Sequence, residues 1–297
     1  MTSQQEENSQ PEQLPVAPNQ VRAAALAELA RLTSFVHDLS LDHWKKPNVC
    51  GEWTMGDVVT HLNLILRLHN QLISAVIAGR GSGSVWKRVG QLSQRVMPAA
   101  SPALNAINSA LPRVLDRAFS PEVVKGQSAS ASRSLNETLT RVGPEDYTRP
   151  VYYQGGPWPL SFLLAALVDE LAVHGWDMAS KLDPHAHLSE DARTVLPSFF
   201  WSGTPFMLRL PKQITGSVQA SLTDPAAEMW WTISDTKTTQ GLGRASNPDV
   251  TLSGMSGTFV LALAGRIRPE EALRSTSLTA SGKEDLARVF LGSWRIL

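Results

Sequence analysis

A glutamate and a histidine four residues apart form the first pattern in the sequence that could do chemistry. Glu170 and His174 lie in an apolar stretch of helical periodicity. A four-residue step puts both side chains on one face of a helix, about 6 Å apart at their Cβ atoms, where they could share one metal ion. Asp177 follows on the same side and could orient the imidazole of His174 through a hydrogen bond. The pattern therefore predicts a pair of metal ligands with a supporting carboxylate.

A second helical stretch supplies a candidate third ligand. His61 stands among apolar neighbours within residues 54–78, and a buried imidazole needs a partner because an unpaired buried polar group costs free energy. Helical bundles build metal sites from inward side chains of facing helices, so His61 could join the pair, with Asp57 one turn earlier as a supporting carboxylate. Two imidazoles and one carboxylate with an open position indicate a catalytic zinc site, or an octahedral site for Fe, Mn or Ni.

Spacing alone also allows a purely structural role for these residues. Glu and His four residues apart occur often on helices. A single buried histidine is more often a hydrogen-bonded core residue than a metal ligand. The residues by themselves leave both interpretations open.

Helical periodicity predicts the elements that must position the candidate ligands. Thr54 and Asp57 resemble a capping box at the start of the helix that carries His61. A Gly- and Pro-rich aromatic loop is expected over residues 147–158. Prolines interrupt the helical pattern of residues 85–120. The four bundle helices are expected over residues 21–39, 54–78, 121–142 and 160–181, the last apolar on most sides and therefore deep in the bundle.

The sequence changes in character after residue 183. A helix over residues 189–208, interrupted at Gly203 and Pro205, precedes a series of strand-like and helical runs. This succession favours an α+β domain joined to an all-α bundle. We expect a disordered tail over residues 1–18, a helical bundle over 19–183 and an α+β domain over 184–297. The strand-like runs are residues 217–222, 228–234 and 249–253, and the helical runs are residues 254–264 and 282–290.

Composition narrows the class of protein. A chain of 297 residues that is 42% hydrophobic and 18% charged suits a folded protein of two domains. Its 27 basic and 27 acidic side chains give a formal charge of zero, so no overall field favours nucleic acid or an anionic membrane. Neither a secretory signal nor an apolar run of the roughly 20 residues needed to cross a membrane is visible. We expect a cytoplasmic protein, and the sequence leaves its oligomeric state open.

Cys50 is the single cysteine of the sequence. One cysteine excludes an internal disulfide, a Cys-X-X-Cys redox pair and a cysteine-rich zinc module. No histidine stands in a recognisable motif to activate it, so we interpret Cys50 as a structural loop residue. Any thiol chemistry would therefore use a thiol supplied from outside the protein.

Three segments together resemble the mycothiol-dependent maleylpyruvate isomerase family. Residues 53–62 and 169–177 resemble its DinB-like metal-binding bundle, and residues 248–254 with 261–266 resemble its sterol-carrier-like domain. The resemblance covers nearly all of the chain after the expected tail. It implies a fold of the α plus α+β class, in which a DinB-like four-helix bundle is followed by a sterol-carrier-like α+β domain.

The resemblance also implies a ligand set and a cosubstrate. A divalent ion, zinc before other metals, would be held by His61, Glu170 and His174. Family members use the ion to bind the thiolate of a low-molecular-weight thiol, which attacks an electrophilic substrate. A C-terminal arginine assists with the dicarboxylate substrate, and Arg266 and Arg268 are the matches here. An arginine fork suits the geometry of a carboxylate.

Two functions of different kinds follow. The first is a thiol-dependent S-transferase or maleylpyruvate-type cis-trans isomerase, whose thiol is mycothiol, bacillithiol, glutathione or ergothioneine. We expect its active site between the two domains. The alternative is a non-enzymatic carrier of a small molecule or lipid, with a C-terminal cavity lined by Trp230, Trp231, Phe259 and Leu263.

Overall fold

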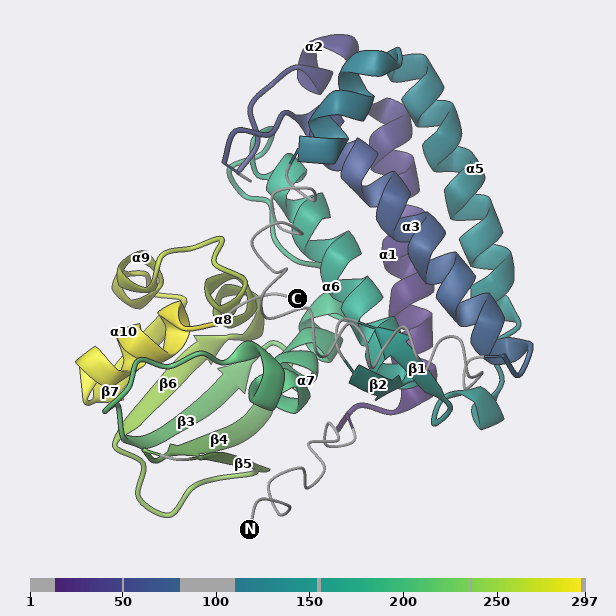
Figure 1. The fold of residues 1–297 in the computed structure, drawn as a ribbon. Coiled ribbons are helices and arrows are strands. Elements are labelled where there is room, and N and C mark those ends of the chain that lie inside the picture. Colours follow the sequence, from purple (N-terminus) through teal and green to yellow (C-terminus); the bar gives the residue numbers. More distant parts are fainter. Residues whose placement is uncertain (1–13, 50, 81–109, 154–155, 236, 295–297) are drawn as a thin grey trace. The chain divides into compact units, whose positions relative to one another are not determined.

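Helices form the first part of the chain and a mixed sheet forms most of the second (Figure 1). The computed structural model describes residues 14–49, 51–80, 110–153, 156–235 and 237–294. Cys50, most of the expected tail and most of the proline-interrupted segment lie outside these residues. The chain divides into two compact units within α7 (Glu190–Met207), between Val195 and Leu196. Our predicted division at residue 183 precedes that helix and stays a prediction.

The first unit contains a bundle of the helices α1 (Pro18–Asp38), α3 (Met55–Ile77), α5 (Pro121–Thr140) and α6 (Leu160–Ala179) (Figure 1). Both α1 and α3 pack against α5 and α6, so these helices close a ring. Most residues of α6 are buried. Each helix agrees with a predicted one to within three residues at either end, and the predicted fold class is confirmed. No helix in the described part of the chain is long and apolar enough to span a membrane.

The start of α3 is held by the predicted capping box, which the structure confirms. The Asp57 backbone N–H donates to Thr54 Oγ1 at 3.2 Å, and the Thr54 backbone N–H donates to Asp57 Oδ2 at 2.8 Å. Gly56 lies against Trp44, the last residue of α2 (Leu41–Trp44), and a Cβ atom at Gly56 would lie 2.1 Å from Trp44 Nε1. Glycine is therefore required for this close approach. These contacts fix where α3 begins.

The predicted aromatic loop is instead a hairpin of β1 (Pro150–Tyr153) and β2 (Gly156–Pro159). The strands pair antiparallel, with Val151 opposite Trp158. The ring of Trp158 stacks on that of Phe162 in the first turn of α6, with centroids 4.2 Å apart and planes at 11°. The prolines in this segment favoured a loop over strands, because proline has no N–H to donate to the hydrogen bonds between strands. The strands form because they are short and are anchored by this buried pair.

The second unit is built on a sheet with the strand order β5-β4-β3-β6-β7 in the described residues (Figure 1). β3 pairs parallel with β6, and the other neighbours pair antiparallel. The helices α8 (Ser256–Leu263) and α10 (Glu284–Gly292) pack on β3 and β6, and α9 (Pro269–Arg274) packs beside β7. The strands are β3 (Gly216–Thr223), β4 (Ala227–Ile233), β5 (Thr238–Leu242), β6 (Val250–Met255) and β7 (Leu278–Gly282).

Aromatic side chains fill the core of the second unit. The ring of Trp231 lies 4.9 Å from that of Phe290 and 6.4 Å from that of Phe259, measured between centroids. Trp231 Nε1 donates to Thr204 Oγ1 at 2.8 Å. Three residues predicted to line a carrier cavity, Trp231, Phe259 and Leu263, are thus buried side chains of a packed core.

The predicted interruption of α7 at Gly203 and Pro205 is wrong, because α7 runs through both residues. Pro205 has no amide hydrogen to donate to the carbonyl oxygen of Trp201. That oxygen accepts a bond from Thr204 Oγ1 at 2.8 Å and another from Gln240 Nε2 at 2.7 Å. The missing helical bond is thereby replaced, so the proline is tolerated.

Candidate metal centre

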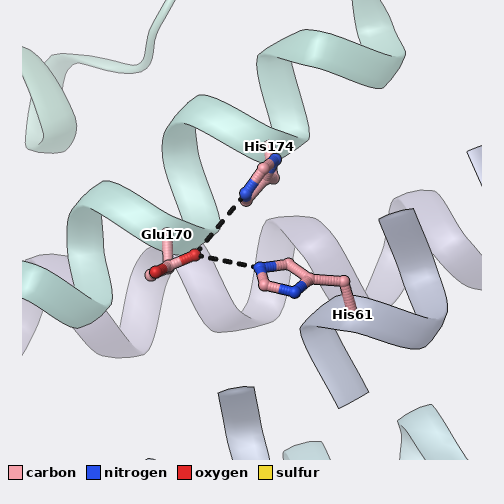
Figure 2. Close-up of side chains that lie close together, drawn as sticks. All are labelled: His61, Glu170 and His174. Carbon is pink, nitrogen blue, oxygen red and sulfur yellow. Dashed lines mark hydrogen bonds and ion pairs between the residues drawn. The ribbon is translucent and has the colours of Figure 1, made fainter. Parts of the chain in front are cut away.

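The side chains of His61, Glu170 and His174 converge between two helices of the bundle (Figure 2). His61 comes from α3, whereas Glu170 and His174 lie one turn apart on α6. Glu170 Oε2 lies 3.4 Å from His61 Nε2 and 3.5 Å from His174 Nε2. All three candidate ligand atoms lie within 4.8 Å of one another. The packing of α3 on α6 thus brings together the three residues predicted as ligands.

The separations between these atoms fit ligands of one ion better than strong hydrogen bonds. Hydrogen bonds between ionised partners measure about 2.7–2.9 Å, and the two contacts of Glu170 Oε2 are longer, at 3.4 and 3.5 Å. Two atoms each ~2.1 Å from a tetrahedral ion lie ~3.4 Å apart. The residues present therefore fit a zinc ion or a similar divalent ion.

Electrostatics keep the glutamate ionised. Burial raises the pKa of Glu170, but the neighbouring imidazoles of His61 and His174 outweigh it and lower this pKa to about 2. Further along α3, burial lowers the pKa of His69, although its ring Nδ1 lies 3.0 Å from the carbonyl oxygen of Ile65. The site thus offers a carboxylate at neutral pH, the form that metal binding requires.

Asp177 lies where it can orient a ligand. Its Oδ2 is 2.9 Å from His174 Nδ1, and its side chain is fully buried. A ring nitrogen that faces a carboxylate carries the proton, which leaves His174 Nε2, the atom nearer Glu170, with a lone pair for a metal. The carboxylate of Asp57, by contrast, accepts bonds from Thr54. The contacts that the structure gives Asp57 therefore hold the start of α3.

Changing Asp177 to asparagine is expected to weaken metal affinity by about 10- to 100-fold, because an amide does not fix the tautomer of His174 as a carboxylate does. Competition with a chromophoric chelator would measure the change. Asp183→Asn is the matched control, since Asp183 lies just after α6 and accepts a bond from the His185 backbone N–H at 2.8 Å. Equal metal affinity in both variants would contradict the role of Asp177.

The two predicted arginines belong to the second unit. Arg266 and Arg268 lie between α8 and α9, where Arg266 donates to the carbonyl oxygen of Ala264 at 2.9 Å and Arg268 is the N-cap residue of α9. Their contact with substrate, and the active site between the domains, stay predictions.

Trp53 is a residue of this site that sequence reasoning missed. Its ring centroid lies 5.1 Å from that of His61 and 6.3 Å from that of His174, and the two imidazoles are 5.0 Å apart. The signal that could have found it is its position directly before Thr54, the N-cap residue of the helix that carries His61.

Comparison with known proteins gives one family and one fold. Residues 25–179 match the family described as the mycothiol maleylpyruvate isomerase N-terminal domain. Two solved structures, the mycothiol-dependent maleylpyruvate isomerase and its histidine-to-alanine mutant, are 12% identical to this chain, with TM-scores of 0.55 and 0.56. Each alignment covers 90% of this chain and 93% of the other. At this identity the likeness shows the fold alone. No curated protein sequence matches.

Proposed function

Because this chain belongs to the mycothiol maleylpyruvate isomerase N-terminal domain family, we propose that it is a metal-dependent enzyme with a low-molecular-weight thiol as cosubstrate. The reaction is thiol transfer to an electrophile or a cis-trans isomerisation of the maleylpyruvate type. The observation that carries the proposal is the convergence of His61, Glu170 and His174 within 4.8 Å. Mycothiol, bacillithiol, glutathione and ergothioneine are the candidate thiols.

The chain's own residues supply a defined environment for such a thiol. His61, Glu170 and His174 would hold zinc or a related divalent ion. When bound, the ion would keep a coordinated thiol in its nucleophilic thiolate form at neutral pH. The ligands contribute only one negative charge, that of Glu170, so a positive charge remains to attract an anionic sulfur. Asp177 keeps the imidazole of His174 in the orientation that binding needs.

The direct test is a turnover screen of small thiols against activated alkenes and epoxides, including a maleylpyruvate-type substrate. We expect product only when zinc-loaded protein and a thiol are both present, and loss of turnover after chelation that zinc restores. An isomerase returns the thiol unchanged, whereas a transferase consumes it, so free thiol measured at the end separates the two. Turnover that persists without metal would contradict the proposal.

Replacing Arg266 or Arg268 by alanine is expected to lower kcat/KM by about 10-fold or more for an anionic substrate, since a hydrogen bond to a charged group is lost. Metal content should stay unchanged because neither residue is a proposed ligand. Arg274→Ala is the control, since Arg274 Nε donates to the carbonyl oxygen of Glu270 at 2.9 Å on α9. Unchanged kcat/KM in both single variants would contradict a role of Arg266 and Arg268 in binding the substrate.

A further inference from the structure

The backbone at Trp53 is held at its carbonyl oxygen and at the residue that follows it. Its carbonyl oxygen accepts a bond from the Asn48 backbone N–H at 2.7 Å. The next residue, Thr54, bridges to Pro47 and caps α3. The backbone position of Trp53 is therefore tied to the start of the helix that carries His61, and its ring contacts both imidazoles of the cluster.

The indole borders a cluster that is not fully closed to solvent. The side chains of Glu170 and His174 are each 13% exposed, and Trp53 is itself half-buried while it contacts both imidazoles. A molecule bound at these ligand atoms would therefore have an aromatic ring nearby.

We infer that Trp53 is a positioning residue for the thiol and that its ring favours sulfur over oxygen at the open position of the metal site. Sulfur is polarisable and makes favourable contacts with aromatic rings at about 5 Å. A carboxylate needs several hydrogen-bond donors to replace its water, and an aromatic wall does not supply them. The thiol binds as a thiolate, so its proton passes to solvent. This inference rests on the proposed function.

A role of Trp53 in contacting sulfur and a merely structural role differ in how the loss of Trp53 changes the selectivity between a thiolate and a carboxylate. If Trp53 only supported the fold, its loss would weaken every ligand of the metal by a similar factor. If its ring contacts sulfur, its loss weakens a thiolate more than a carboxylate. The ratio of the two affinities is therefore the informative quantity, and it does not depend on turnover.

The experiment uses the full chain loaded with cobalt(II), whose visible spectrum reports coordination and whose near-ultraviolet charge-transfer band reports a bound thiolate. The wild type, Trp53→Ala and Trp53→Phe are each titrated with 2-mercaptoethanol and with acetate. We expect Trp53→Ala to lower the ratio of thiol to acetate affinity by about 2- to 10-fold, the range of sulfur–aromatic contacts. Trp53→Phe should keep most of that ratio.

Trp176→Phe is the matched control. Trp176 lies two residues after His174, is half-buried and donates from Nε1 to the carbonyl oxygen of Ala186 at 3.0 Å. The ratio of thiol to acetate affinity in Trp176→Phe should equal that of the wild type. If Trp53→Ala fails to fold, Trp53→Leu keeps an apolar side chain without a ring and should lower the ratio likewise.

The outcomes separate the two proposals. A thiolate band in the wild type with an unchanged affinity ratio in Trp53→Ala or Trp53→Leu overturns the role of Trp53 alone. A cobalt-loaded wild type that shows no thiolate band overturns the proposed function and this inference with it. A lowered ratio that phenylalanine restores supports both.

Discussion

Replacing His61 or His174 by alanine is expected to abolish both metal retention and thiol-dependent turnover. Each imidazole supplies one of three candidate ligand atoms that lie within 4.8 Å of one another. Loss of a group that merely orients a ligand costs about 10- to 100-fold in metal affinity, so loss of a ligand should cost more than about 100-fold. Elemental analysis after gel filtration, together with turnover in the presence of added zinc, would measure both effects.

His37→Ala is the control for this experiment. His37 lies exposed in the last turn of α1, beside Asp38, and its removal should leave metal content and turnover unchanged. It also reports adventitious binding of zinc by a surface histidine. Full metal occupancy in the double variant of His61 and His174 would overturn the ligand assignment.

Changing Phe162 to alanine is expected to destabilise the bundle by about 3–5 kcal/mol, the usual cost of removing a fully buried aromatic side chain. Phe162 is 1% exposed, and its ring stacks on the equally buried Trp158. The loss would leave a cavity and detach the β1–β2 hairpin from the first turn of α6. Hydrogen exchange of α6 amides would report the opening free energy of this helix without assuming that both units unfold together.

Leu68→Ala on α3 serves as the matched control, because its side chain is 40% exposed and truncation at the surface usually changes stability by less than about 0.5 kcal/mol. A loss of under about 1 kcal/mol in Phe162→Ala would show that the stacked Trp158–Phe162 pair does not hold the hairpin on α6.

The bundle was predictable because its helices carry a regular pattern. Apolar side chains at three- and four-residue steps identified α1, α3, α5 and α6, and the Thr54–Asp57 pair identified the start of α3. The four-residue step from Glu170 to His174 was equally visible, because neighbours on one helix face are set by local geometry.

Elements that depend on distant partners in the fold could not be predicted from the sequence. β5 is polar and includes Gly241, over which the ring of Trp230 lies, and it forms because β4 pairs with it. β7 likewise lacks alternation and is ordered by pairing with β6. Pro205 within α7 is tolerated only because other donors bond the carbonyl oxygen of Trp201. Such compensation is made by tertiary contacts and has no local signature.

The convergence of the three candidate ligands was predictable, but their surroundings were not. Glu170 and His61 are 109 positions apart. Their proximity was therefore predicted from bundle packing and family resemblance and not from their spacing in the sequence. The contact of Trp53 with both imidazoles depends on where the loop before α3 is held. That placement is set by two backbone hydrogen bonds, from the Asn48 N–H to the Trp53 carbonyl oxygen and from the Met55 N–H to the Lys46 carbonyl oxygen. No periodic pattern in the sequence predicts these bonds.

The central claim, a divalent ion held by the three side chains, is tested most directly by elemental analysis combined with X-ray absorption spectroscopy of the unmodified protein. The account predicts about one zinc or related ion per chain, bound by imidazole nitrogen and carboxylate oxygen at ~2.0–2.2 Å. Protein that neither retains nor takes up a divalent ion would contradict the claim, as would a bound ion whose spectrum is unchanged when His61 and His174 are replaced.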